Sequence, residues 1–439
     1  MALFSLKNNR LHIKGERNTA GQNIVPIALP KEVHISMKQG QCDPAEPVVS
    51  AGDSVCVGQL IGRNPSPLSV PVHSSVSGVV KAVVPEPSQS GGFEMHVVIE
   101  CDGRQDFADS VVPPVIESPK DFINAVRESG LVGLGGAGFP MAAKFAPCVG
   151  AHVDTLIINC AECEPFLTVD RMTMLAHSRD VINGSEIIMK WLGISRCIIG
   201  INRSMREVYE HFEDMLKDST NFSLRYIPDT YPIGAENVII RELTGRTLLP
   251  GRIPPDVGCL VCNVNSVVKL QHYLSTGLPL VTKNLTVDGS AVAARRNIEV
   301  PIGTLVSDIF QFCGGAAEGC EPVMILFDGV MMGHIAESDS LPVTGSNNSV
   351  LFFDEDFARR LEPTACINCG RCIRSCPQKL MPGRIYDAVM AGNTSFLGKS
   401  GAYSCINCGA CSYVCPARRR LSSTVYGYAL KTKGGRKNE

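Results

Sequence analysis

Two runs of cysteines near the end of the chain have the residue type and the spacing that iron–sulfur chemistry requires. Both follow the pattern C-x2-C-x2-C-x3-C-P, the first over Cys366–Pro377 and the second over Cys405–Pro416. Three thiolates spaced by two residues wrap a short loop around one 4Fe–4S cluster, while the fourth cysteine ligates the other cluster. The doubled pattern therefore predicts two clusters that exchange their fourth ligands.

This exchange divides the eight cysteines into two sets of four. The first set is Cys366, Cys369, Cys372 and Cys415, and the second is Cys405, Cys408, Cys411 and Cys376. Structural zinc would need two C-x2-C pairs rather than two runs of four. The other eleven cysteines are scattered and odd in number, which argues against a disulfide framework and for a reducing compartment. Clusters of this kind mostly carry single electrons, so we expect an electron-transfer role.

Composition narrows the remaining classes of function. The 439 residues are 44% hydrophobic and 19% charged, which is typical of a folded protein too long for a single core. A net charge of −2 gives no reason to expect a nucleic-acid partner. The sequence shows neither a signal-peptide pattern nor an apolar run of about 18 residues, so we expect a soluble or peripheral protein.

Changes of pattern divide the chain into five parts. Short strands over 1–115 predict a β barrel or sandwich, and alternating helix and strand patterns over 116–245 predict an α/β domain. Residues 246–345 fit a small α+β module, and 346–420 hold the cysteine runs among short helices. The basic segment 421–439 is expected to be a solvated or disordered end, or to dock on an acidic partner or anionic lipid. The predicted fold class is multidomain α/β and α+β.

The first part also carries a recognisable motif. The pattern GD-x-V-x-x-GQ-x-I, followed by H-x-x-x-SG-x-V, resembles a biotinyl or lipoyl barrel-sandwich hybrid domain. Lys81 lies past the hairpin tip, so it is not placed as the modified lysine of such domains, and we expect only a structural copy of the fold. An anonymous β domain would predict nearly the same. Residues 84–93, rich in Pro, Ser and Gly, are expected to form an exposed loop.

A glycine-rich stretch, Gly130–Pro140, opens the second part. Glycines allow φ > 0 and a close approach of the backbone, which leaves N–H groups free to face phosphates. Lys144 follows and is placed to meet an anion. The stretch differs from the G-x-G-x-x-G fingerprint, so an ordinary dinucleotide site is not favoured. The purely structural alternative is a glycine-rich turn.

Polar residues follow the next predicted strand. A short apolar run at 154–158 reads as a buried parallel strand and ends in Asn159–Pro165. Ligands in open α/β sheets collect at the carboxyl ends of strands. An Asn and two carboxylates there could hydrogen-bond ribityl or ribose hydroxyls, whereas the alternative is a strand-end turn with solvated acids.

Together these segments carry a resemblance to a known flavoprotein. The stretch G-L-x-G-x-G-G-A-G-F-P with Lys144 is similar to the flavin loop of the NADH-oxidising subunit of respiratory complex I. Asn159–Pro165 resembles its N-A-D-E-G-E-P segment, Tyr231–Glu236 its Y-x-x-G-E-E, and Asn263–Ser266 its N-V-E-T. The chain departs from these patterns at Ala161, Ala235 and Asn265.

Over nearly its whole length the chain resembles the RnfC family, whose members are subunits of the ion-pumping ferredoxin:NAD oxidoreductases called Rnf complexes. That family has the order barrel-sandwich domain, flavin domain, SLBB β-grasp domain and two 4Fe–4S clusters. The segments Glu162–Phe166, Leu243–Arg246 and Asp256–Gly258 also look like that family. Cobalamin reductases of propanediol metabolism share the modules but place the flavin loop near the N-terminus.

The resemblance implies a set of cofactor-binding residues and no catalytic side chain, because the cofactors carry the chemistry. The implied FMN contacts are Gly133, Gly135, Gly136, Gly138, Lys144, Asn159, Glu162, Tyr231, Gly234, Asn263 and Ser266. NADH would stack on Phe139, with Glu164 and Glu236 near the nicotinamide ribose and ring.

The resemblance also implies a role for the whole chain. It would be a cytoplasmic peripheral subunit at the inner face of the cell membrane, exchanging hydride with NAD(H) through FMN and single electrons through its clusters. Its partners would be membrane subunits and a ferredoxin-accepting iron–sulfur subunit, and only these partners would contact the membrane. Two alternatives remain: a reductase of the same modules serving cobalamin or a selenoenzyme, and a non-enzymatic two-cluster adaptor whose flavin loop is vestigial.

Overall fold

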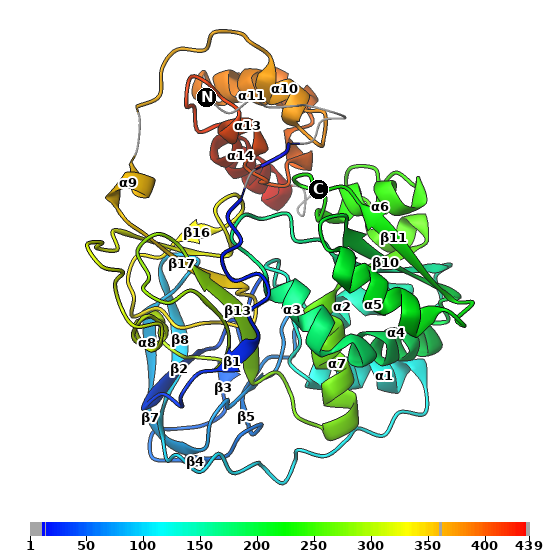
Figure 1. Cartoon of the computed structure of the whole chain (residues 1–439), viewed down its shortest axis with the longest axis vertical. Helices are drawn as coiled ribbons and strands as arrows, with labels where there is room; N and C mark the ends of the chain where they lie inside the picture. Colours follow the sequence, from blue (N-terminus) through cyan, green and yellow to red (C-terminus); the bar gives the residue numbers. More distant parts are fainter. Residues whose placement is uncertain (1–10, 14, 360–361, 436–439) are drawn as a thin grey trace.

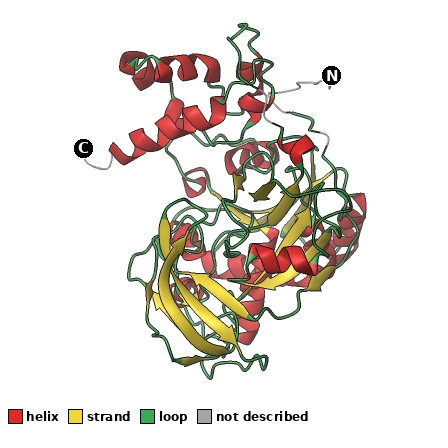
Figure 2. Cartoon of the chain, turned by 90° about the vertical axis from the view of Figure 1, so that its left-hand side faces the viewer, coloured by secondary structure: helices red, strands yellow, loops and turns green. Residues whose placement is uncertain are grey.

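The computed structural model describes residues 11–13, 15–359 and 362–435. Figure 1 shows a helical unit at the top, a β-rich body at the lower left and an α/β unit at the right. The segment that precedes the first strand runs between these bodies (Figure 1). The turned view in Figure 2 shows the strands in the lower part of the molecule and the helical unit above them.

The first unit is a pair of small antiparallel sheets. One has the order β2 (Glu32–Ser36), β8 (Phe93–Cys101), β7 (Gly78–Pro87), β4 (Ser54–Val55), and the other β3 (Glu46–Pro47), β5 (Leu60–Arg63), β6 (Val72–His73). The expectation of an exposed loop at 84–93 is wrong for most of that range, because β7 continues to Pro87 and β8 begins at Phe93. In the turn between them, Gln89 Nε2 donates to the Pro342 carbonyl at 2.6 Å, so the turn docks on another unit.

The second unit is a four-stranded parallel sheet with helices packed around it. Its order is β11 (Phe222–Ile227), β10 (Arg196–Asn202), β9 (Thr155–Cys160), β12 (Cys259–Asn263). Its helices are α1 (Pro119–Glu128), α2 (Met141–Phe145), α3 (Val169–Ala176), α4 (Ser178–Leu192), α5 (Arg206–Leu216), α6 (Glu236–Thr244) and α7 (Val264–Thr276), with short 3-10 turns at Ala146–Cys148 and Pro254–Val257. Strand β9 is buried almost throughout, as a parallel strand covered on both faces must be. Because β12 pairs with β9, the unit extends beyond residue 245, where the sequence predicted its end.

The third unit is a six-stranded mixed sheet. Its order is β1 (Ile24–Pro26), β14 (Arg296–Pro301), β13 (Thr282–Asp288), β17 (Ser349–Phe353), β15 (Met324–Phe327), β16 (His334–Ile335), accompanied by α8 (Val306–Phe312) and α9 (Glu355–Ala358). The predicted boundaries at 115 and 345 are too simple, because β1 crosses over from the first part and β17 lies beyond residue 345.

The fourth unit is helical and holds the cysteine runs. It comprises α10 (Arg371–Ser375), α11 (Pro382–Met390), α12 (Thr394–Lys399), a 3-10 turn at Ala402–Ser404, α13 (Ala410–Tyr413) and α14 (Leu421–Gly435). The expected solvated tail is wrong for most of its length: Leu421, Val425 and Ala429 of α14 are buried. The last residues, 436–439, lie outside the described part of the chain.

The units share hydrophobic cores rather than hanging on linkers. One core joins Ile35 and Val97 of the first unit to Phe122 and Leu156 of the second. A smaller one joins Leu11 and Tyr231 to Cys408, Ala410 and Val414 of the helical unit. The positions of the cysteine runs relative to the α/β unit are therefore set by apolar packing.

Candidate functional site

A cleft of about 1600 Å³ lies where the four units meet. It is lined by the glycine-rich loop, the ends of β9 and β12, loops of both β-rich units, and the segment Cys405–Asn407. Ligands of parallel sheets collect at the carboxyl ends of the strands, and β9 and β12 present these ends here. The cleft is thus the candidate cofactor site.

Most residues predicted to bind cofactor line this cleft. Eleven of the fourteen do so: Gly133, Gly135, Gly136, Phe139, Lys144, Asn159, Glu162, Glu164, Gly234, Glu236 and Asn263. The other three, Gly138, Tyr231 and Ser266, do not line it and hold the surrounding structure instead. The structure therefore brings together four segments that are far apart in the sequence.

The glycine loop is packed too closely to accept side chains. Gly136 and Gly138 have φ of 96° and 62°, in the left-handed region that favours glycine. A Cβ at Gly135 would lie 2.9 Å from Asn263 Nδ2, and one at Gly138 would lie 2.8 Å from Gly40 Cα. The loop backbone is therefore pressed between the start of α7 and the first unit.

Two buried side chains hold the middle of this loop from beneath. The Leu134 amide donates to Ser266 Oγ at 2.9 Å, and Lys283 Nζ donates to the Leu134 carbonyl at 2.6 Å. Lys283 is only 1% exposed, and its burial lowers its pKa to about 8. Sequence reasoning missed Lys283, since nothing in its own strand marks it.

The cradle fits a flavin phosphate and ribityl chain. The Oδ1 atom of Asn348 is buried and has no hydrogen-bond partner in the part of the chain described. The Nδ2 atom of the same side chain is 3.2 Å from where a Cβ of Gly136 would lie. Buried polar atoms normally have partners, so a polar ligand against the loop would complete this one. Neither Asn348 nor its neighbourhood was predicted from the sequence.

An ion pair supplies the cation on the cleft wall. Lys144 Nζ and Glu236 Oε1 are 2.7 Å apart. Burial alone would lower the pKa of Lys144, but the Glu236 carboxylate outweighs it and the pKa lies above its usual range. Lys144 therefore stays protonated at neutral pH.

Two asparagines position the strand ends rather than reaching freely into the cleft. Asn159 Nδ2 donates to the Gly234 carbonyl at 2.9 Å, which ties β9 to the Tyr231–Glu236 turn. Asn263 caps α7 by accepting from the Asn265 amide at 2.9 Å, and its Nδ2 donates to Asp170 Oδ2 at 2.8 Å. Two of the predicted segments are thus held together by side-chain amides.

Both predicted glutamates have a raised pKa. Glu162 is buried, pairs with Arg17 at 3.2 Å and accepts from the Arg171 amide at 2.8 Å; burial raises its pKa to about 8. Glu164 accepts from the amides of Met331 and Met332 at 3.1 and 3.0 Å, and burial likewise raises its pKa to about 8. Both groups therefore hold a proton through most of the neutral pH range.

The second predicted ligand set lines one small cavity. Cys376, Cys405, Cys408 and Cys411 all face it, together with apolar residues such as Leu380 and Val425. Cys376 comes from the first run, so the cavity contains the exchanged fourth ligand that the sequence predicts. The donor set of four cysteines fits a 4Fe–4S cluster.

The first ligand set lies on a more exposed loop. Cys366 and Cys369 are exposed, whereas Cys372 and Cys415 are partly buried. The Thr364 amide donates to the Ala417 carbonyl at 2.9 Å, which brings the stretch before Cys366 next to the stretch after Cys415. Within the described ranges no three potential ligands are spaced for a single ion. Because each cysteine of a 4Fe–4S cluster binds its own iron, four ligands need not converge on one point.

The two runs also share a backbone conformation. Asn368 and Asn407, which occupy equivalent positions, have φ of 54° and 53°. Gly370 and Gly409 follow with φ of 69° and 71°. Asparagine is among the few non-glycine residues that visit this region readily. Both loops are thus shaped to wrap the same kind of group.

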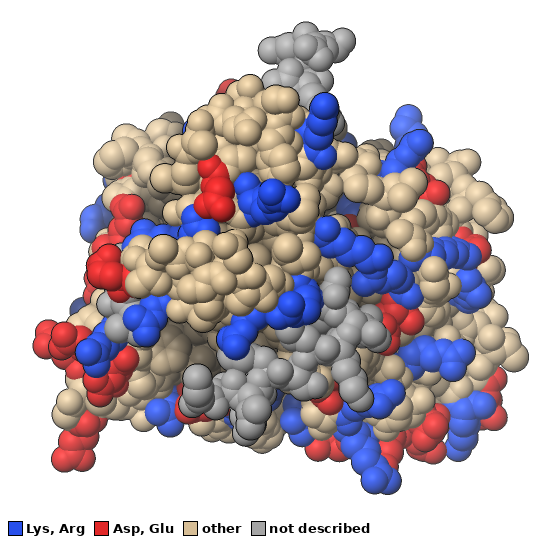
Figure 3. Space-filling view, turned by 90° about the horizontal axis from the view of Figure 1, so that it is seen from above, with Lys and Arg blue, Asp and Glu red and all other residues tan. Residues whose placement is uncertain are grey.

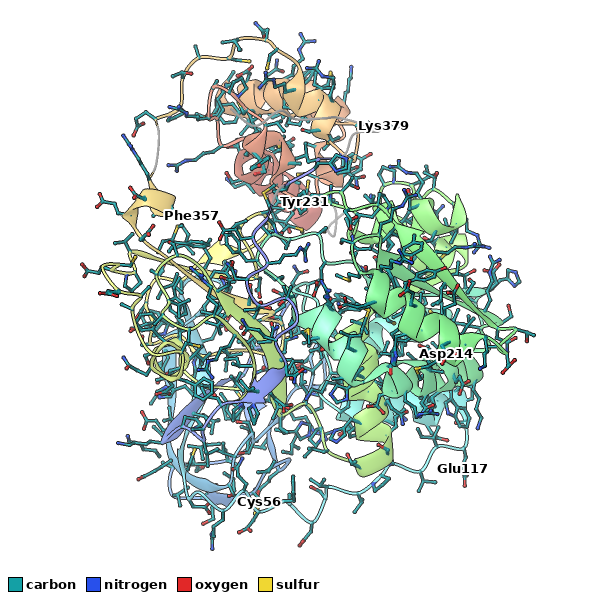
Figure 4. The ribbon with its side chains drawn as sticks, viewed as in Figure 1. Cys56, Glu117, Asp214, Tyr231, Phe357 and Lys379 are labelled. Atoms are coloured by element: carbon teal, nitrogen blue, oxygen red, sulfur yellow. The ribbon has the colours of Figure 1, made fainter. Side chains whose placement is uncertain are left out.

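The cofactor cleft and the cysteine cavity are adjacent. Gln378, Cys405 and Ile406 line both of them. Tyr231, which Figure 4 labels at the junction of the helical unit with the rest, is 1% exposed and donates its hydroxyl to the Cys408 carbonyl at 2.6 Å. The second cysteine set is therefore the one that faces the cleft.

Three families match successive parts of the chain. The RnfC barrel sandwich hybrid domain matches residues 9–104, the Nuo51 FMN-binding domain 126–272, and a 4Fe-4S dicluster domain 359–416. Fold and site thus define a protein that combines a barrel-sandwich domain with an FMN-binding domain and a 4Fe–4S dicluster domain. The mixed α/β multidomain architecture predicted from the sequence is confirmed, whereas the assignment of the third unit as SLBB stays a prediction.

Relatives over most of the chain give the family. The RnfC subunit of the proton-translocating ferredoxin:NAD(+) oxidoreductase complex of Clostridium ljungdahlii is 34% identical, over 84% of this chain and 81% of that one. The corresponding subunit of the Na(+)-translocating complex of Acetobacterium woodii is 34% identical over 81% and 79%. That of the ion-translocating oxidoreductase complex of Rhodobacter capsulatus is 31% identical over 91% and 77%. The chain belongs to the RnfC family, and the resemblance seen in the sequence is confirmed.

A solved structure shares the fold. A chain of an NAD+-reducing [NiFe]-hydrogenase in the H2-reduced state matches with a TM-score of 0.50 and 19% identity, over 71% of this chain and 61% of that one. Separately, the described part of the chain contains no helix of the length and apolarity that crossing a membrane requires.

Proposed function

We propose that this chain is the NAD(H)-handling subunit of an ion-translocating ferredoxin:NAD+ oxidoreductase complex. The observation that carries the proposal is the shared wall of Gln378, Cys405 and Ile406 between the flavin-type cleft and the four-cysteine cavity. When bound, FMN supplies the exchange between two-electron chemistry at nicotinamide and one-electron chemistry at the clusters. The family membership and the matching FMN-binding and dicluster domains support the same role.

The residues of the cleft bind and orient the cofactors. The glycine loop and Lys144 hold the flavin phosphate, while Lys283 and Ser266 fix the loop through Leu134. Phe139, which is 39% exposed in the cleft, offers its ring to the nicotinamide nucleotide. Glu164 and Glu236 then lie on the wall nearest the nicotinamide, and Glu164 holds a proton there at neutral pH. Surrounding apolar residues exclude water from the reacting rings.

The clusters are assigned as the sequence predicts. Cys376, Cys405, Cys408 and Cys411 hold the cluster next to the cleft, and Cys366, Cys369, Cys372 and Cys415 hold the outer one. Electrons pass between flavin and the outer surface through this pair. The third unit is proposed to be an SLBB domain, whose loop at Met331 and Met332 holds Glu164.

The partners and the location follow from this role. The other subunits of the complex would include membrane subunits and a ferredoxin-accepting iron–sulfur subunit. The chain would sit on the cytoplasmic side of the membrane and contact it through those partners. A reductase serving cobalamin or a selenoenzyme has no observation in its favour here.

Anaerobic cofactor analysis tests the proposal. The purified chain should release one FMN per polypeptide on denaturation, and about eight iron atoms, the count for two four-iron clusters. Adding NADH without oxygen should bleach the flavin absorbance, with NADPH as the control nucleotide. Stoichiometric iron without flavin would favour the two-cluster adaptor, and zinc in place of iron would contradict the assignment altogether.

A further inference from the structure

The helical unit differs from the rest of the chain in charge. Residues 363–431 contain nine Lys and Arg and a single acidic residue, Asp387, giving a formal charge of +8. The whole chain carries −2, so the remainder carries −10. Asp387 is itself ion-paired with Arg419. The positive charge of this unit is therefore not balanced within its own segment.

The positive side chains surround the exposed cysteine loop. We define the basic face as the exposed Arg371, Arg374, Arg384, Arg418 and Arg420. Arg371 and Arg374 lie on α10, within the first run. Arg384 follows Gly383, whose Cβ would lie 3.5 Å from Cys372 Sγ. Arg418 and Arg420 follow Ala417, which is hydrogen-bonded to Thr364 just before Cys366.

Apolar side chains are exposed in the same place. Ile367 is 67% exposed and Ile373 is 41% exposed, and both lie within the first run. In the view from above, blue side chains spread over the centre and red ones gather mostly toward the edges (Figure 3). An apolar centre with a charged surround is the usual anatomy of a protein interface.

We propose that the basic face docks an acidic electron-transfer protein and brings that protein's redox centre to the Cys366–Cys372 loop. The inference rests on the proposed function, because it takes the outer cluster as the point of entry or exit. The exchange is one electron lost by one centre and gained by the other, with no bond made or broken. Charge complementarity speeds such encounters and orients the partners, and it weakens as salt rises.

A protein fits the face better than an anionic lipid surface does. The face is centred on exposed cluster ligands, which a lipid headgroup has no use for. Electron transfer needs the two centres close together, and the exposed ligands Cys366 and Cys369 provide that approach. Encounters between redox proteins bury small interfaces and rely on steering by charge.

Charge reversal on the holoprotein tests the inference. The variant Arg371→Glu/Arg384→Glu/Arg420→Glu reverses three side chains of the basic face. The matched control Lys31→Glu/Lys120→Glu/Arg225→Glu reverses three exposed side chains of the other units. The probe is a purified acidic two-cluster bacterial ferredoxin, with its Kd measured at about 0.05 and 0.3 M salt. Pelleting with phosphatidylglycerol or phosphatidylcholine vesicles is run in parallel.

The face variant should weaken ferredoxin binding roughly tenfold or more at low salt, while the control changes it less than about twofold. High salt should weaken the wild type toward the face variant. Equal losses in both variants would overturn the proposal, as would binding to phosphatidylglycerol vesicles without binding to ferredoxin. NADH oxidation with ferricyanide, together with iron and FMN content, reports separately on the proposed function and should be unchanged in the face variant.

Discussion

The hydroxyl of Tyr231 in the α/β unit donates a 2.6 Å hydrogen bond to the main-chain carbonyl of Cys408 in the helical unit. The Tyr231 side chain is also close enough to Glu164 to raise its own pKa, although burial is the larger cause. One buried side chain thus contacts both the cleft wall and the loop that holds the inner cluster.

Removing this hydroxyl should affect the inner cluster and not the flavin. In Tyr231→Phe the Cys408 carbonyl loses a buried partner, which should cost about 1–3 kcal/mol of unfolding free energy. The midpoint potential of the inner cluster should shift because hydrogen bonds around the cysteines tune it. Redox titration followed by EPR measures the shift, and FMN content should stay at the wild-type value.

Tyr226→Phe is the matched control for that variant. Tyr226 is 40% exposed and stacks on Tyr209 with ring centroids 3.8 Å apart, so the ring contact survives the change. Its stability and both cluster potentials should equal those of the wild type. An unchanged inner potential in Tyr231→Phe would show that the hydrogen bond does not reach the cluster.

Lys283 should govern flavin affinity without touching the flavin. In Lys283→Met the Leu134 carbonyl loses a charged donor, and Asp170 and Asp328 lose their nearby cation. Loosening of the loop should weaken FMN binding about tenfold, the equivalent of one charged hydrogen bond of about 1.4 kcal/mol. Lys269→Met, which instead removes an ion pair with Glu299 at 2.8 Å, should leave FMN affinity unchanged. Flavin fluorescence titration of the apoprotein compares them.

Glu164 should make stability depend on pH in a known direction. Its pKa is about 8 in the folded chain against 4.5 for the ordinary side chain. Between these values the unfolded chain binds fewer protons, so stability is greatest below about pH 4.5 and falls as pH rises toward 8. Glu164→Gln should reduce that slope, with a constant offset from the changed contacts to the Met331 and Met332 amides. Urea unfolding at several pH values measures it, and an unaltered slope would mean that Glu164 is ionised in the folded chain.

The exchanged ligation gives reciprocal predictions. Cys376→Ala should damage the cluster built on the second run, and Cys415→Ala the cluster built on the first. EPR of reduced samples with iron analysis distinguishes the two signals, because the first loop is exposed and the second is enclosed. Loss confined to the mutated run's own cluster would reject the exchange.

The cysteine sets and the glycine loop could be predicted because local spacing encodes them. The contacts of Lys283 and Arg17 could not, since their partners Leu134 and Glu162 lie 149 and 145 residues away in the sequence. The same holds for Asn348, which meets Gly136 only when the third unit packs on the second. These roles exist only in the tertiary structure.

The tail shows a different kind of error. Its basic residues suggested a solvated end, yet Leu421, Val425 and Ala429 recur every four residues and form the buried stripe of α14. Here the helical period was present in the sequence, and composition was given too much weight. Tyr231 was misplaced because a resemblance transfers a residue's position and not its side-chain direction.

The central claim is that the glycine loop holds a flavin beside the enclosed cysteine set, and FMN content of two glycine variants tests it most directly. Gly136 and Gly150 both have positive φ, 96° and 79°, so valine strains both backbones alike. A Cβ meets Asn348 at Gly136 and nothing within 4 Å at Gly150. Anaerobically purified Gly136→Val should lose FMN and keep about eight iron atoms, while Gly150→Val keeps both. One FMN per chain retained in Gly136→Val would contradict the account.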